Sequence, residues 1–171
     1  ELVTITGVMQ PMTASGQFEV AESILDLADE SRASRLLVLA GLASEPEKRS
    51  IFAVCSDMEV RKALESEDIE VSIEQPKAGM IGVAGMVLSL APIKGVSAIG
   101  VVAETIGASS DILAAERMSR WIEQAFDVTL DLDLDTTKET AARLMERMGE
   151  EGSIEDYISM GDNEASSDFY V

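Results

Sequence analysis

The sequence predicts an α/β domain in which helices pack on a largely parallel β-sheet. Short, continuous apolar runs, as expected in strands buried on both faces, alternate with longer segments that have one apolar face. This alternation repeats along most of the chain, and strand–helix–strand repetition favours a layered sandwich with parallel strands. The 171 residues suffice for one domain with a full core.

The N-terminal half is expected to contain four strands and two helices. The strands are expected at Leu2–Val8, Arg35–Ala40, Ile51–Cys55 and Ile69–Ile73. Apolar residues recur at helical spacing within Gly16–Ser31, which gives this segment one apolar face. A second helix is expected to end near Ser66. Ser56 or Asp57 precedes it, and both residue types accept hydrogen bonds from the first backbone N–H groups of a helix.

The C-terminal half contributes two more strands and three helices. The strands are expected at Ser97–Ala103 and Val128–Leu134, and the helices at Met86–Leu90, from Ser110 or Asp111 to Ala125, and at Thr136–Met148. Pro92 is expected to stop the first of these helices, because proline lacks the N–H group that continues one. Thr136 and Glu139 form a capping box at the start of the last helix. We expect one domain over residues 1–159 and a flexible acidic tail over residues 160–171.

The charge of the chain excludes several classes of partner. With 32 acidic residues, 13 basic residues and no histidine, the net charge is −19, which disfavours nucleic acids and anionic membranes. Cys55 is the only cysteine, so an intramolecular disulfide and a cysteine-based metal cage are excluded. No signal peptide or membrane-spanning apolar run is visible, which favours a cytoplasmic location. The chain starts without methionine in a strand-like run, so we expect an N-terminal part of the fold to be missing.

Three glycines, Gly79, Gly82 and Gly85, precede a predicted helix and invite comparison with phosphate-binding loops. Their spacing is not that of a dinucleotide fingerprint, and no Lys-Ser or Lys-Thr pair follows as in a P-loop. We favour a packing role, in which small residues let the helix approach the sheet or another subunit. No cofactor is indicated.

Asp131, Asp133 and Asp135 imitate the start of a calcium-binding loop. Thr136 stands where such a loop needs glycine, and Ala142 stands where it needs glutamate. We therefore expect an acidic solvated strand face and no metal site.

Glu104 and Thr105 follow a predicted strand directly, at the edge where open α/β sheets commonly bind ligands. Gln10 is expected along the same edge. One carboxylate without a histidine, an activated serine or a second acid is a weak basis for catalysis. No Gly-x-Ser-x-Gly elbow occurs either. We favour a structural role for Glu104, as an acceptor of hydrogen bonds from backbone amides, over a catalytic one.

The chain ends in Phe169-Tyr170-Val171: a hydrophobic residue, a tyrosine and a last residue with the free carboxylate. This is the HbYX pattern by which proteasome activators and assembly factors dock onto the proteasome core particle. Residues Gly149–Val171 contain seven acidic side chains and no basic ones, so the two terminal aromatics lie on a solvated arm. We interpret the exposed apolar tip as a ligand for another protein.

Two motifs carry a resemblance to a known family. Gly82-Val-Ala-Gly85 precedes an apolar helix, and Ala103-Glu104-Thr105-Ile106-Gly107 follows after a strand. In this respect the chain resembles the PAC2-like family of archaeal proteasome assembly chaperone homologues, which shows Gly-Leu-x-Gly and then Gly-Glu-Thr-x-Gly. Ala103 departs from the second pattern. The segment Gln17–Leu25 is also similar to the first helix of that family.

The resemblance implies a three-layer α/β/α Rossmann-like sandwich, similar in shape to nucleoside phosphorylases, without an established catalytic set. It also implies homo-oligomers and, in some members, binding of the tail to the α-ring of the core particle. The expected function is that of a proteasome assembly chaperone or an ATP-independent proteasome-binding factor. Its expected partners are core-particle α-subunits and further copies of the chain. Met80–Ile93 and Leu2–Val8 are the segments expected to be covered by another copy.

Two alternatives stay open. One is an enzyme of nucleoside phosphorylase or hydrolase type, with a deep pocket lined by Gln10, Glu104 and Thr105. The other is a scaffold module in which the tail is idle. The possible strand-edge or family-motif site consists of Gln10, Gly82, Gly85, Glu104, Thr105 and Gly107.

Overall fold

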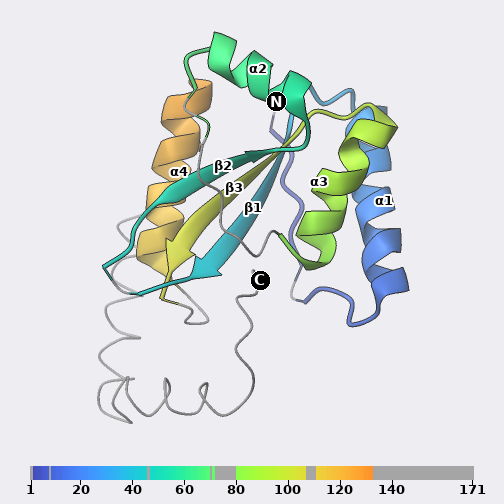
Figure 1. The fold of residues 1–171 in the computed structure, drawn as a ribbon, viewed down its shortest axis with the longest axis horizontal. Coiled ribbons are helices and arrows are strands. Elements are labelled where there is room, and N and C mark those ends of the chain that lie inside the picture. Colours follow the sequence, from blue (N-terminus) through green and yellow to red (C-terminus); the bar gives the residue numbers. More distant parts are fainter. Residues whose placement is uncertain are drawn as a thin grey trace. The chain divides into compact units, whose positions relative to one another are not determined.

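The computed structural model describes residues 2–7, 9–45, 47–69, 71, 80–106 and 111–132, and these form a mixed α/β fold. The elements in chain order are α1 (Ala14–Glu30), β1 (Leu36–Ala43), β2 (Ile51–Cys55), α2 (Met58–Ser66), α3 (Gly82–Lys94), β3 (Ala98–Thr105) and α4 (Ile112–Phe126) (Figure 1). The predicted helix Thr136–Met148 and the tail from residue 160 lie outside the described residues, as does most of Ile69–Ile73.

The three strands are ordered β1-β3-β2, and β3 is parallel to β1. Leu36 N donates to the Ser97 carbonyl at 2.9 Å, and Ser44 N donates to the Thr105 carbonyl at 2.8 Å. The sequence offset is the same at both ends of the pair, as parallel strands require. In Figure 1 the arrows of β1 and β3 point the same way.

The second strand pair corrects the prediction of a largely parallel sheet. Ser56 N donates to the Ala98 carbonyl at 3.1 Å, and Glu104 N donates to the Ser50 carbonyl at 3.0 Å. The start of each strand therefore meets the end of the other, so β2 and β3 are antiparallel. The reason lies in the short link between β1 and β2, because a parallel crossover needs a dozen or more residues.

Contacts within the chain divide it into two compact units. The first comprises the described residues of Glu1–Ala40 and Phe52–Val102, and the second comprises those of Gly41–Ile51 and Ala103–Phe169. In the first unit α1 packs against α3, as Figure 1 shows. Their facing sides form one buried cluster, which consists of Ala21, Leu25, Ala28, Val87, Leu88, Ala91, Val96 and Ala98.

Helix α1 begins two residues earlier than its apolar period suggests, because Thr13 caps it. The Thr13 side chain accepts a hydrogen bond from Gly16 N at 3.2 Å and so satisfies one free N–H group of the first turn. Leu25 at the centre of the apolar face is fully buried. The amphipathic pattern of Gly16–Ser31 is thus confirmed as the packing face.

Helix α3 is longer than predicted at both ends. It begins at Gly82 and ends at Lys94, so the expectation that Pro92 stops the helix is wrong. Pro92 lies in the last turn, where it removes one bond, the one its N–H group would donate to the Leu88 carbonyl, and the helix still continues for two residues. Gly95, with φ 70°, ends the helix in the left-handed conformation that glycine adopts readily.

Two predicted strands are not formed in the described residues. Residues 2–7 are irregular, and Leu2, Val3 and Ile5 are exposed. Residues 128–132 are irregular too, and Leu130 N donates to Glu123 Oε1 at 2.9 Å instead of to a neighbouring strand. Alternating apolar residues are compatible with a strand, but a strand also needs a partner for its backbone groups.

The second unit contains α4, whose predicted cap is confirmed. Asp111 Oδ1 accepts a hydrogen bond from Ala114 N at 2.9 Å. Ala114 and Ile122 are buried, and the rings of Trp121 and Phe126 meet edge to face at a centroid distance of 6.0 Å. None of the described helices combines the length and the hydropathy that crossing a bilayer requires.

Candidate functional site

In the first unit, Gln10 caps the start of helix α3. Gln10 Oε1 accepts a hydrogen bond from Val83 N at 3.2 Å, whereas the N-cap residue Ile81 supplies no side-chain acceptor. Gly82 adopts φ 73°, and a Cβ atom there would collide with Gln10 Oε1. Gly82 thus lets the backbone turn into the helix and leaves room for the amide that caps it.

Gly85 has a related role within the same turn. A Cβ atom on Gly85 would collide with the carbonyl oxygen of Met80. Gly82 and Gly85 therefore permit close approach, but to Gln10 and to Met80. The packing interpretation expected approach to the sheet or to another subunit, and these contacts do not show that. Gly79 lies outside the described residues.

Replacing Gly82 by alanine should destabilise the chain by about 1–3 kcal/mol, because the left-handed backbone and the displaced Gln10 amide both add cost. Gly95→Ala is the matched control. Gly95 has φ 70°, but a Cβ atom there meets nothing within 4 Å. Urea unfolding should show a larger loss for Gly82→Ala than for Gly95→Ala. Equal losses would mean that the Gln10 contact contributes nothing to stability.

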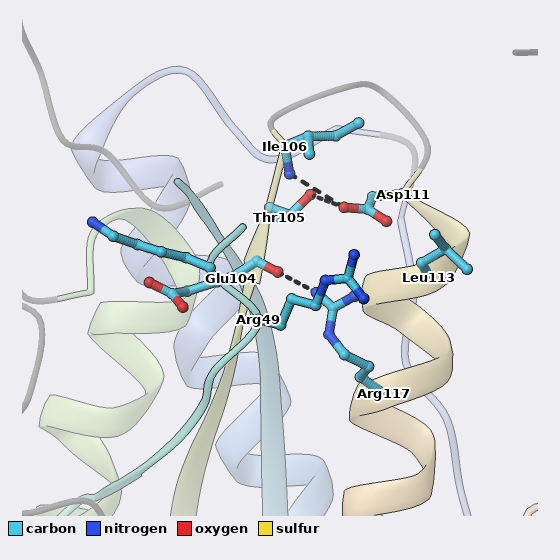
Figure 2. A pocket seen from close by; sticks show the side chains of 8 residues that line it. Arg49, Glu104, Thr105, Ile106, Asp111, Leu113 and Arg117 are labelled. Carbon is cyan, nitrogen blue, oxygen red and sulfur yellow. Dashed lines mark hydrogen bonds between the residues drawn. The ribbon is translucent and has the colours of Figure 1, made fainter. Parts of the chain in front are cut away.

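In the second unit, Glu104 is a buried carboxylate with a neutral donor on each oxygen. Its side chain is only 6% exposed. Ser44 Oγ donates to Oε1 at 3.1 Å, and Ser50 N donates to Oε2 at 2.9 Å. The Glu104 backbone carbonyl accepts from Arg117 Nη2 at 2.6 Å (Figure 2). The two carboxylate bonds tie β3 to the link between β1 and β2, so this carboxylate has a clear structural role, and the backbone carbonyl adds the bond to α4.

Asp111 joins the end of β3 to the start of α4. Its Oδ2 accepts from Thr105 Oγ1 at 2.8 Å and from Ile106 N at 3.2 Å (Figure 2). Burial acts to raise the pKa of Asp111, but the hydrogen bonds from Ala114 N, Thr105 and Ile106 N and the charge of Arg117 outweigh it. The pKa of this carboxyl group is therefore lowered, and the anion is the favoured form.

These groups surround a cavity of about 140 Å³ in the second unit. Figure 2 shows the residues that line it, which are Lys48, Arg49, Glu104, Thr105, Ile106, Asp111, Leu113 and Arg117. The lining combines three cationic side chains, two carboxylates and two apolar side chains. It includes Glu104 and Thr105 but not Gln10, so the pocket expected for an enzyme with all three residues is not found in the described part of the chain.

Sequence reasoning placed Glu104 and Thr105 just beyond a strand, and they form the last two residues of β3. Gly107 of the same motif lies outside the described residues. Sequence reasoning missed the basic side chains of the cavity. The position of Arg117 could have been inferred from the sequence. Arg117 follows Ala114, the residue that Asp111 caps, by three positions, and residues three apart lie on the same face of helix α4.

The described residues contain no cluster of acidic or thiol side chains that would hold a metal ion. Asp131 adopts φ 49°, and Asp133 and Asp135 lie outside the described residues. The burial of Cys55 raises the pKa of its thiol, which disfavours the reactive thiolate.

Comparison with known proteins gives a family-level match over most of the chain. The model of the PAC2 family matches residues 1–151. An uncharacterized protein of Methanocaldococcus jannaschii is 26% identical over 117 residues, which cover 67% of this chain and 45% of that protein.

Solved structures share the fold. PbaA of Pyrococcus furiosus, described as an archaeal homolog of proteasome-assembly chaperone, has a TM-score of 0.63 and 20% identity over 82% of this chain and 62% of its own. PbaB of the same organism, described as an archaeal proteasome activator, has a TM-score of 0.66 and 21% identity over 82% of this chain and 60% of its own. A PAC2 family protein of Streptomyces avermitilis has a TM-score of 0.62 and 17% identity, over 82% and 59%. The chain thus spans less than two thirds of each of these relatives.

Proposed function

The chain belongs to the PAC2 family, and on this premise we propose that it is a proteasome-binding factor, either an assembly chaperone or an ATP-independent activator. The family match over residues 1–151 is the observation that carries the proposal. Two solved relatives of the same fold are described as a homolog of proteasome-assembly chaperone and as a proteasome activator. We further propose that the complete domain is a three-layer α/β/α Rossmann-like sandwich, as the sequence resemblance implies.

The docking element in this proposal is the tail Phe169-Tyr170-Val171. Tyr170 would enter a cleft between neighbouring α-subunits of the core particle, and the carboxylate of Val171 would pair with a lysine there. Phe169 would add apolar contact beside it. The support is the HbYX pattern itself and the acidic, polar segment before it, a composition typical of solvated segments.

No observation favours the enzyme alternative. Both oxygens of Glu104 already accept hydrogen bonds from neutral donors, and the chain has no histidine to act as a general base beside it. The descriptions of the two Pyrococcus relatives name no catalytic activity.

The direct test of the proposal is binding of the purified chain to isolated proteasome α-rings. Retention of the chain on immobilised α-rings, and its loss when the three terminal residues are deleted, would support tail docking. Equal retention of both forms would place any contact in the body of the chain, and absence of retention would count against proteasome binding altogether.

We also propose that the chain forms homo-oligomers through its exposed apolar side chains. Leu2, Val3 and Ile93 are each more than 60% exposed and lie in the two segments, Leu2–Val8 and Met80–Ile93, that are expected to be covered by another copy, whereas Met58 lies outside both. Light scattering of the full-length protein at micromolar concentration should give more than one chain. Ile93→Lys should shift the mass toward the monomer, whereas Met58→Lys, at an exposed site on α2, should not. A monomer mass for the unmodified protein would contradict this proposal.

A further inference from the structure

We propose that the cavity at the end of β3 binds the oxyanion of a small organic acid or phosphate ester through Arg49, Arg117 and Lys48. This binding site is independent of proteasome docking. It rests on the charge pattern of the lining, on the free donors of the two arginines, and on the size and the apolar walls of the cavity.

Cationic side chains are concentrated at this cavity although the chain as a whole is strongly acidic. The chain has only 13 basic residues and 32 acidic ones, yet three of the basic residues line this cavity. In the described chain, neither Arg49 nor Arg117 has a carboxylate within ion-pair distance, although other arginines do. Lys48 reaches only the exposed carboxylate of Glu45, at 3.6 Å.

Arg117 gives the most direct support for a ligand. Its Nη2 is bound to the Glu104 carbonyl, but its Nε is buried and has no hydrogen-bond partner among the described residues. A buried charged donor without an acceptor is costly, and an oxyanion in the cavity would supply that acceptor. The planar guanidinium group suits both carboxylate and phosphate oxygens, because it can donate two parallel hydrogen bonds.

The two carboxylates reduce the net charge of the lining to +1, and the charge of Arg117 acts on Asp111, but neither carboxylate forms an ion pair with an arginine in the described chain. Glu104 is held by Ser44 and Ser50, and Asp111 is held by Thr105, Ile106 and Ala114. Both are fixed by neutral donors. The three cations therefore outnumber two carboxylates whose oxygens are already occupied, and the arginine donors remain available to a ligand.

The dimensions of the cavity indicate what kind of molecule would fit. Its volume of about 140 Å³ is roughly ten times the 10–15 Å³ that one water needs on the same scale. Ile106 and Leu113 add apolar walls and are 46% and 49% exposed. An oxyanion attached to a short apolar body fits these features better than a free inorganic ion, because the body would cover the two apolar side chains.

The proposal is tested by titrating the full-length protein with inorganic phosphate and with butyrate, at constant ionic strength set by chloride. Calorimetry should show saturable binding of at least one probe, and the melting temperature should rise with its concentration. Arg49→Gln should weaken this binding by about tenfold, because it removes one charged hydrogen-bond donor. Arg49 is exposed and forms no hydrogen bond or ion pair with another described residue, so this variant should fold normally.

Lys62→Gln is the matched control, because it removes one exposed positive charge from α2, in the other unit. It should leave the dissociation constant unchanged. Equal weakening by both variants would reduce the effect to overall charge and overturn the site. Absence of saturable binding by both phosphate and butyrate at millimolar concentration would overturn it as well. Tighter binding of butyrate than of phosphate would assign the site to organic acids, and the reverse order would assign it to phosphate groups.

Discussion

Replacing Glu104 by alanine should lower the free energy of unfolding by about 2–4 kcal/mol, which is a large share of the stability of a domain of this size. The substitution leaves Ser50 N and Ser44 Oγ without their acceptor and opens a cavity at a side chain that is only 6% exposed. Removal of a buried charge offsets part of this loss, but unpaired donors and lost packing outweigh it. Urea unfolding followed by circular dichroism measures the change.

Two companion variants separate the contributions to that loss. Glu104→Gln keeps an oxygen that can accept from Ser50 N and should cost less than the alanine variant. Ser44→Ala removes only the weaker bond to Oε1 and should change stability by about 1 kcal/mol. Full stability of Glu104→Ala would show that the carboxylate does not hold the fold. The structural interpretation of Glu104 would then be wrong.

Local signals in the sequence predicted the elements that depend on local bonds. The bounds of Ile51–Cys55 agree with the structure, and Asp57 and Asp111 cap the helices that follow them. Hydrogen bonds between a cap and the second or third following residue are set by a few neighbouring residues, so a short stretch of sequence reveals them. The apolar run Ser97–Ala103 likewise identified β3, which is buried along almost its whole length.

One error depends on distant residues, whereas the other two concern local features of the chain. Leu2–Val8 has the pattern of a strand, but within the described residues no strand pairs with it. The antiparallel direction of β2 follows from the short link to β1, whose length can be read directly from the sequence. Helix α3 continues past Pro92 to Lys94, and it ends where Gly95 adopts the left-handed conformation.

For the candidate sites as well, the sequence predicted local positions but not contacts between distant residues. Their position at the end of β3 followed from the strand pattern, because Glu104 and Thr105 come directly after an apolar run. Their partners did not, since Ser44 and Ser50 lie 60 and 54 residues away in the chain. Only the folded sheet brings these residues together, and no spacing in the sequence encodes that contact.

Tyr170→Ala should weaken binding to the proteasome α-ring by about 2–4 kcal/mol, or roughly thirtyfold to a thousandfold. A tyrosine buried in a subunit cleft and a terminal carboxylate paired with a lysine would together form a small anchor, so most of the binding energy would depend on a few atoms. Surface plasmon resonance on immobilised α-rings measures the loss. The melting temperature should stay the same, because we expect the tail to contribute little to the core.

Tyr157→Ala is the matched control, because Tyr157 is the other tyrosine of the chain and also lies in the acidic C-terminal region. It should leave α-ring binding unchanged. Addition of one residue after Val171 should weaken binding nearly as much as Tyr170→Ala does, since it moves the terminal charge out of register with the lysine. One tail should bind weakly, because ordering the terminal segment on binding would cost entropy, and an oligomer with several tails should gain strongly through avidity. If Tyr170→Ala and the extended chain both bind as tightly as the unmodified protein, the tail is not the docking element.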